Sequence, residues 1–168
     1  MRVVEGIADI GGETAPDVGS FVQFLDEVGT DHGVTVQAFD ARCIVSRRHL
    51  ERAVELADRE RSRGAAIARD RGVEIMLYAA GRRQIDRALE IGVSEGETST
   101  VVVVSGDGDE AAAADAVADS LLPAETLGNY DRDRVRSFYD IGVAELEATT
   151  ASLEALVLER VALLVVER

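Results

Sequence analysis

The residues of this sequence best suited to contact an anionic partner are its arginines. All eighteen basic residues are arginine, and twelve of them lie between Arg42 and Arg87, a window with seven acids. The other 122 residues carry six arginines against 25 acids. Clustered arginine creates a local attractive field whatever the net charge of the chain. The asymmetry therefore indicates an anionic partner; the alternative is that these arginines only solvate two helices.

Residue types that carry covalent or metal chemistry are scarce. The two histidines match no metal-ligand pattern: His32 lies in a predicted turn, and His49 follows a helix start, where exposure or helix-end stabilisation is expected. The single cysteine, Cys43, is expected to be a buried structural thiol, which fits a reducing cytosol. The absence of lysine excludes Schiff-base and Walker-type chemistry. We expect no catalytic residue, no metal and no cofactor.

One glycine motif, residues 106–109, follows a predicted strand and precedes a predicted helix. A dinucleotide fingerprint needs a third glycine, and the carboxylates of Asp107 and Asp109 repel phosphate. We interpret the motif as an acidic turn between a strand and a helix. A less favoured alternative is an uncharacterised enzyme that binds a cation at this turn.

The acidic composition indicates the solvent in which the chain works. A net charge of −14 and a pI near 4.5, without lysine, predict a cytoplasm at molar salt, as in an extreme halophile. The Debye length at 1 M salt is about 3 Å, so repulsion from a polyanion is largely screened. RNA binding is therefore possible, but it must rest on short-range hydrogen bonds and stacking rather than long-range attraction. The sequence has neither a signal-peptide pattern nor a membrane-length apolar run, which predicts a cytoplasmic location.

Apolar periodicity predicts the elements that position these residues. Short or alternating apolar runs predict strands at residues 3–10, 34–39, 75–78 and 100–105. Helical spacing predicts helices at residues 18–28, 46–63, 65–71, 84–91, 111–122, 131–139 and 150–164. Ser46 is the expected N-cap of the second helix, and Ile85, Ala88 and Leu89 are expected to face inward. The pattern predicts a single α/β (α+β) domain over residues 1–168, with a small mixed sheet, several helices and a helical C-terminal region.

Residues 74–88 read Glu-Ile-Met-Leu-Tyr-Ala-Ala-Gly-Arg-Arg-Gln-Ile-Asp-Arg-Ala. This segment resembles the kinase-binding subunit of the KEOPS complex, the archaeal counterpart of the p53-related-protein-kinase-binding protein. In that family a strand ends in Tyr-small-small-Gly-Arg-Arg-Gln-Ile before an amphipathic helix. Residues 65–69 resemble its short helix, and residues 138–142 resemble its Phe-Tyr-x-Ile region. Residues 145–147, followed by residues 153–164, resemble its closing helix. The matching blocks keep the same order over most of residues 44–164.

The resemblance implies a small α/β protein that is not an enzyme and that binds the atypical kinase/ATPase subunit of KEOPS. The whole complex installs threonylcarbamoyl on adenosine in ANN-decoding tRNAs. For an archaeal member, the resemblance also implies a role as a tRNA-recruiting subunit that engages the single-stranded 3′ CCA end. This chain departs from the family in charge, because the lysines expected in archaeal relatives are absent.

The matched arginines are the predicted RNA contacts. We expect Gly81 to end a strand and the next three residues to form the first turn of a helix. A helix N-terminus attracts anions, and each cation placed there costs roughly 0.3–1 kcal/mol, so this position favours a phosphate-binding role. The predicted RNA-binding residues are Arg82, Arg83, Gln84, Arg42, Arg47 and Arg48. Tyr78 is expected to lie in the core.

The kinase contact is predicted on the final helix. That helix is apolar around most of its circumference, so it is either fully buried or covered by a protein partner on one side. The predicted partner-binding residues are Ile141, Leu153, Leu156, Val157 and Arg160. A purely structural interaction module without an RNA role remains the alternative to a kinase- and tRNA-binding subunit.

Overall fold

The computed structural model describes residues 1–166. Contacts within the chain divide it into two compact units. The first unit comprises Met1–Arg42 and Gly92–Asn129, and the second comprises Cys43–Ile91 and Tyr130–Arg168. Each unit therefore draws on two separate stretches of the sequence, and each is described by itself.

The first unit is built on a three-stranded sheet. Its elements are β1 (Arg2–Ile10), α1 (Val18–His32), β2 (Thr35–Asp40), β3 (Gly96–Ser105) and α5 (Glu110–Ser120). The strand order is β1-β3-β2, and β3 is antiparallel to both neighbours. The α/β class is confirmed, and three of the four predicted strands are present. The sheet is antiparallel rather than mixed, because the third strand enters between the first two and runs opposite to both.

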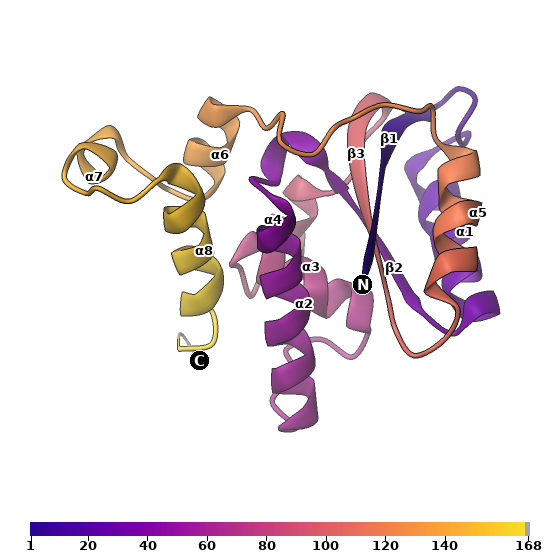
Figure 1. Cartoon of the computed structure of the whole chain (residues 1–168), viewed down its shortest axis with the longest axis horizontal. Helices are drawn as coiled ribbons and strands as arrows, with labels where there is room; N and C mark the ends of the chain where they lie inside the picture. Colours follow the sequence, from indigo (N-terminus) through magenta and orange to yellow (C-terminus); the bar gives the residue numbers. More distant parts are fainter. Residues whose placement is uncertain (167–168) are drawn as a thin grey trace. The chain divides into compact units, whose positions relative to one another are not determined.

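Alternating side chains of the sheet make the core of this unit. Val4 pairs with Val102, and Val36 pairs with Val104, so all four lie on one face of the sheet. Helices α1 and α5 cover that face in Figure 1. Phe21 of α1 and other apolar residues of both helices belong to the same buried cluster. The three strands were predicted from alternating or short apolar runs, α1 from its helical apolar spacing, and α5 from its alanine-rich sequence.

The second unit is helical among its described residues. It contains α2 (Arg47–Ser62), α3 (Arg71–Ala80), α4 (Ile85–Ala88), the 3₁₀ turn η2 (Leu89–Ile91), α6 (Arg132–Phe138), α7 (Val143–Glu147) and α8 (Leu153–Leu163). A further 3₁₀ turn, η1 (Ala41–Cys43), lies where the two units meet along the sequence. Helices α2, α3 and α8 contact one another in pairs, and Figure 1 shows α2 and α3 side by side.

The strand predicted at residues 75–78 is wrong, since this segment belongs to helix α3. The side chain of Asp70 caps the helix by accepting a hydrogen bond from the Val73 N–H at 2.9 Å. Gly81 ends it in the left-handed conformation with φ 63°. Seven consecutive residues, from Glu74 to Ala80, are buried. A helix buried on every side shows no polar face, and a short apolar run then cannot be told from a strand by periodicity.

The short helix predicted at residues 65–71 is also wrong, because residues 65–70 form a loop before α3. The carboxylate of Glu74, itself fully buried, accepts hydrogen bonds from the N–H groups of Ile67 at 3.0 Å and Ala68 at 2.7 Å. A buried carboxylate needs partners, and here the loop backbone supplies them. Glu74 therefore determines the path of the loop.

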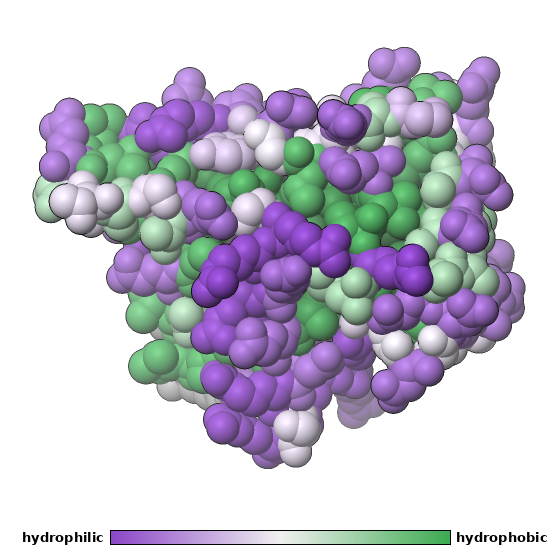
Figure 2. All heavy atoms as spheres, in the orientation of Figure 1, coloured by the Kyte–Doolittle hydropathy of each residue, from purple (hydrophilic) through white to green (hydrophobic). Residues whose placement is uncertain are grey.

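Several predicted helix boundaries agree with the structure. Ser46 caps α2 by accepting from the His49 N–H at 3.2 Å, and Asp131 caps α6 by accepting from the Arg134 N–H at 3.1 Å. The last helix begins at Leu153, after the cap residue Ser152, which is three residues later than predicted. Hydrophilic residues cover the solvent side of α2 in Figure 2. Within residues 1–166, every helix is too short or too polar to cross a membrane.

Candidate functional site

The two units differ sharply in charge. The first holds two arginines and sixteen acids, and the second holds sixteen of each, so the formal charges are −14 and zero. The acidic excess of the chain thus belongs entirely to the first unit. Five of the six predicted RNA-binding residues lie in the neutral second unit, and Arg42 lies in the first.

Arg82 is committed to contacts inside the second unit. Its Nη2 donates to the carbonyl oxygen of Phe138 and, at 3.2 Å, to the carboxylate of Asp140. Its guanidinium carbon also lies 5.2 Å from the centroid of the Phe138 ring. This side chain joins the end of α3 to the end of α6. Arg82 is thus occupied by contacts within its own unit.

Arg83 and Gln84 are exposed in the connection between α3 and α4. The predicted placement of residues 82–84 inside a helical turn is wrong, because α4 begins at Ile85 and spans only four residues. Gln84 is the N-cap residue, yet its side chain makes no capping hydrogen bond. Neither side chain makes an ion pair or a hydrogen bond with another described residue. Both side chains are free to contact a ligand. Because they precede α4, the expected cost of placing cations inside the first helical turn does not apply to them.

Apolar surface adjoins these two side chains. Ile85 is 50% exposed and Leu89 is 58% exposed, although both were predicted to face inward. Only Ala88 of the three predicted residues is buried, because α4 is too short to present a full inward stripe. The connection therefore offers one free cation, one free amide and two exposed aliphatic side chains.

The remaining predicted arginines differ from one another. Arg42 forms a two-bond ion pair with Asp40, with Nε–Oδ1 at 3.0 Å and Nη2–Oδ2 at 2.7 Å. Arg47 pairs with Glu51, one helical turn away, and both are exposed. Arg48 is exposed and makes no ion pair or hydrogen bond with the described residues. Arg48 therefore joins Arg83 as a cation available to a partner.

A buried polar network joins the start of α2, the end of α3 and the residue that follows α6. His49 was expected at the surface or at a helix end, yet it is fully buried. The Val45 N–H donates to its Nδ1 at 3.3 Å, which leaves the ring proton on Nε2 to donate to the Ala79 carbonyl oxygen at 2.8 Å. The Tyr139 hydroxyl donates to the same oxygen, also at 2.8 Å. Burial lowers the pKa of His49 to about 4 and raises that of Tyr139.

The network has a clear structural role. Ala79 lies in the last turn of α3, where carbonyl groups have no partner within the helix. His49 and Tyr139 supply the two donors that its oxygen can accept. The hydroxyl of Tyr78, in contrast, is buried without a hydrogen-bond partner among the described residues, and burial raises its pKa. Tyr78 is a core residue, as predicted.

Four of the five predicted partner-binding residues are core residues. Ile141, Leu153, Leu156 and Val157 are each at most 5% exposed. Arg160 is partly exposed, and its Nε donates to the Tyr139 carbonyl oxygen at 3.1 Å. Its Nη2 donates to the Asp140 carbonyl oxygen at 3.2 Å and to the Glu145 carboxylate at 2.8 Å. These five residues hold α8 against the rest of the second unit. Other residues therefore form the solvent-exposed surface of α8.

The solvent side of α8 carries apolar residues. Leu158 and Ala162 are half-buried, Leu163 is 38% exposed, and Val166 just beyond the helix is 76% exposed. Residues 158 and 162 are spaced by four, which places them along one side of α8, and Val166 follows in the turn after the helix. This group, Leu158, Ala162, Leu163 and Val166, is called the outer side of α8.

The acidic turn at residues 106–109 starts helix α5. Asp109 caps it by accepting from the Ala112 N–H at 3.0 Å, and the Gly106 N–H donates to the Glu110 carboxylate at 3.1 Å. Within residues 1–166, there is no group of three or more His, Cys, Asp or Glu residues placed to hold a metal ion. The contacts of this turn are those of a helix cap.

Comparison with known families matches residues 23–164 to the model of the kinase-binding protein CGI-121. The chain belongs to the CGI-121 family. The match spans most of the chain and includes the α3–α4 connection, the buried network and nearly all of α8. Membership of a kinase-binding family confirms the coarser part of the resemblance seen in the sequence. A search of curated proteins found no match.

Some contacts of this CGI-121 family member were missed by sequence reasoning. The roles of Glu74, His49 and Arg160 all depend on partners at least six residues away in the sequence. One signal was available for α3, namely Asp70 and Gly81 as a cap pair around an apolar run. No local signal distinguishes the committed Arg82 from the free Arg83.

Proposed function

We propose that this chain is a non-catalytic subunit that binds an atypical kinase/ATPase and presents tRNA to it, as part of a KEOPS-type complex. The RNA target is the single-stranded 3′ CCA end, and the modification served is threonylcarbamoylation of adenosine. Membership of the CGI-121 family supports the kinase-binding half. The observation that carries the RNA-binding half is the exposed, unpaired Arg83–Gln84 pair at the α3–α4 connection.

The chemistry of this connection suits a single-stranded RNA end. An arginine can hold a phosphate through two hydrogen bonds or stack on a base, and a glutamine amide can pair with a base edge. Ile85 and Leu89 offer apolar surface to a base that has left its stack. These contacts act at short range, so they persist at molar salt, where long-range attraction is screened. Arg48 and Arg47 supply further phosphate contacts in this proposal.

The kinase contact is proposed on the outer side of α8. The residues first predicted for it support this helix from within, and the exposed Leu163 and Val166 are the apolar groups available to a partner. A protein partner that covers them removes apolar surface from water, which favours association. Arg160 stays in place as the residue that anchors α8 to the Tyr139–Asp140 corner.

The RNA half is tested by fluorescence anisotropy of the full chain with tRNA in molar KCl. Intact tRNA is expected to bind, and tRNA without its 3′ CCA is expected to bind at least tenfold more weakly. Arg83→Glu should weaken binding of intact tRNA by a similar factor. Arg87→Glu is the matched control, because Arg87 is also exposed on this segment but is paired with Glu90.

Equal binding of the two tRNAs, or equal loss with Arg83→Glu and Arg87→Glu, would remove the proposed reading of the 3′ end. Complete absence of tRNA binding would leave a protein-interaction module with solvating arginines. The kinase half is separate, because it is measured with the protein partner alone.

The kinase half is tested by size-exclusion chromatography of the full chain with its cognate atypical kinase. Leu163→Arg is expected to abolish the complex without unfolding the chain. The control is Val22→Arg, which places the same charge at an exposed apolar position on α1. An intact complex with Leu163→Arg, or its loss with Val22→Arg, would contradict the proposed surface.

A further inference from the structure

The outer edge of strand β1 is only partly paired. β1 is an edge strand of the sheet, and Ile7 exchanges two backbone hydrogen bonds with Leu122 on the side away from β3, at 2.8 and 2.9 Å. Alternate residues of a strand direct their backbone groups to the same side. Glu5 and Val3 therefore direct theirs to the same outer edge as Ile7. Within the described residues, no backbone group pairs with them there.

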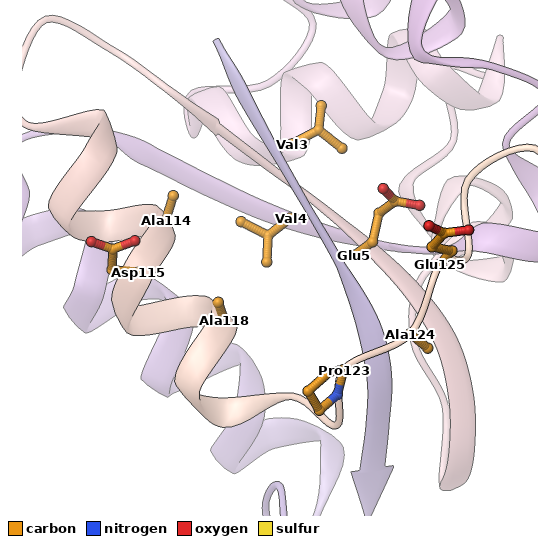
Figure 3. Close-up of a pocket in the computed structure, with 9 residues that line it drawn as sticks. All are labelled: Val3, Val4, Glu5, Ala114, Asp115, Ala118, Pro123, Ala124 and Glu125. Carbon is orange, nitrogen blue, oxygen red and sulfur yellow. The ribbon is translucent and has the colours of Figure 1, made fainter.

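An open notch of about 640 Å³ lies along this unpaired stretch. Helix α5 forms one wall with Ala114 and Ala118, and Pro123, Ala124 and Glu125 form the other. Figure 3 shows Val4 directed toward α5, while Glu5 and Glu125 lie together on the opposite side of β1. Figure 2 shows an apolar area of surface at the position of β1, and hydrophilic residues border this area. The notch thus combines free backbone groups, a small-residue apolar wall and a carboxylate wall.

The wall opposite α5 is fixed in place. The carboxylate of Glu5 accepts from the N–H groups of Thr126 at 2.9 Å and Leu127 at 2.6 Å, and the Thr126 hydroxyl donates to the Thr100 carbonyl oxygen at 2.8 Å. Beyond the backbone pair of Ile7 and Leu122, the segment after α5 is therefore attached to the sheet through side chains rather than through strand pairing. This arrangement leaves the edge at Val3 and Glu5 open while it holds the second wall.

We propose that this notch binds an extended segment of a partner protein, which adds to β1 as a fourth strand. Main-chain hydrogen bonds to Val3 and Glu5 hold it, as in other strand-addition interfaces. Successive side chains of the added strand point to opposite walls. Small apolar side chains therefore face Ala114 and Ala118, and basic side chains face Glu5 and Glu125.

Charge selects the occupant. Three carboxylates, of Glu5, Asp115 and Glu125, line the notch, and no basic residue lines it. The unit that contains it carries a formal charge of −14. A second copy of this chain is disfavoured, because pairing of two β1 edges brings like charges together. Nucleic acid is disfavoured for the same reason, and a segment with alternating apolar and basic residues fits.

The test uses the full chain and a ten-residue peptide of alternating valine and arginine, with blocked ends. Amide hydrogen exchange of Val3 and Glu5 is expected to be fast in the free protein and at least tenfold slower with saturating peptide. The amide of Val4 is the internal control, because it faces β3 and should be unaffected. A peptide with N-methylated backbone amides should not bind.

Two substitutions in the notch are expected to weaken peptide binding at least tenfold. Ala118→Leu fills the apolar wall, and Glu125→Arg reverses a charge on the other wall. Asp31→Arg is the control, because it makes the same charge change at an exposed position of α1 outside the notch. Asp31→Arg should change the affinity for the peptide by less than twofold.

The proposal is overturned by unchanged exchange at Val3 and Glu5, or by equal binding of the N-methylated peptide. An equal effect of Asp31→Arg would indicate general charge attraction and would also overturn it. Protection of the same amides by a second copy of the chain, detected as concentration-dependent dimerisation, or by an oligonucleotide would replace the proposed partner. The result is independent of tRNA and kinase binding.

Discussion

The Nε2 atom of His49, in the first turn of α2, lies 2.8 Å from the carbonyl oxygen of Ala79, in the last turn of α3. The contact joins two consecutive helices through residues that are 30 positions apart, and the side chain is fully buried. It satisfies a helix-end carbonyl only while the imidazole is correctly oriented. Protonation would keep this donor, but it would place a proton on Nδ1, which accepts from the Val45 N–H, and would bury a charge. The stability of the second unit is thereby linked to pH.

Acid is expected to destabilise the chain through His49. Burial lowers the pKa of this histidine from 6.5 to about 4, so the unfolded chain takes up a proton first. The stability contributed by neutral His49 is complete above pH 6.5 and is lost as the pH falls toward 4. The loss is about 3 kcal/mol in the free energy of unfolding. Urea unfolding across this range measures it.

The control for this prediction is the other histidine. His49→Gln keeps a side-chain amide donor but does not titrate, so the pH dependence between 4 and 6.5 should flatten. The His32→Gln variant should keep the pH dependence of the unmodified chain. A slope that is the same in both variants would contradict the role assigned to His49.

Loss of the Arg160 side chain is expected to loosen the corner between α6 and α7. Arg160→Met removes hydrogen bonds to two carbonyl oxygens and to the Glu145 carboxylate. The group is partly exposed, so solvent reduces the effect, and we expect about 1–2 kcal/mol in the free energy of unfolding. Arg87→Met, which removes an exposed pair with Glu90, should change it by less than about 0.5 kcal/mol. Equal effects in denaturant titrations would rule out the anchoring role.

The loop at residues 65–70 is expected to open when Glu74 loses its charge. Glu74→Gln keeps the shape but replaces one acceptor oxygen with a donor, which leaves the N–H of Ile67 or Ala68 without a partner. The free energy of unfolding is expected to fall by about 1–3 kcal/mol. Amide exchange of Ile67 and Ala68 should accelerate with it. Glu55→Gln, at an exposed position of α2, is the control; faster exchange in that variant as well would argue against a specific contact.

The two sides of α8 are expected to respond differently to truncation. Leu156 is buried, so Leu156→Ala should lower the free energy of unfolding by about 2–5 kcal/mol. Leu163 is 38% exposed, so Leu163→Ala should lower it by less than about 1 kcal/mol while weakening kinase binding. Thermal unfolding and a pull-down with the kinase separate these effects. A large stability loss for Leu163→Ala would show that the outer side of α8 is part of the core.

Much of the fold could be read from local patterns. Local patterns were the alternation in β1, the valine run of β3, the amphipathic spacing of α1, and the caps at Ser46 and Asp131, all of which involve neighbours along the chain. The family was also visible, because its motif around residues 81–85 is continuous in the sequence. The strand predicted at residues 75–78 failed because α3 is buried on all sides and displays no polar face.

The candidate site divides in the same way. Sequence alone determined that arginines gather between residues 42 and 87 and that the chain lacks lysine. Only the tertiary structure decided that Arg82 bonds to Phe138 and Asp140 while the adjacent Arg83 stays free. It also decided that His49 is buried and that Leu153, Leu156 and Val157 face inward. The physical reason is that residue types set what a side chain can bind, whereas burial and pairing depend on which distant segments pack against it.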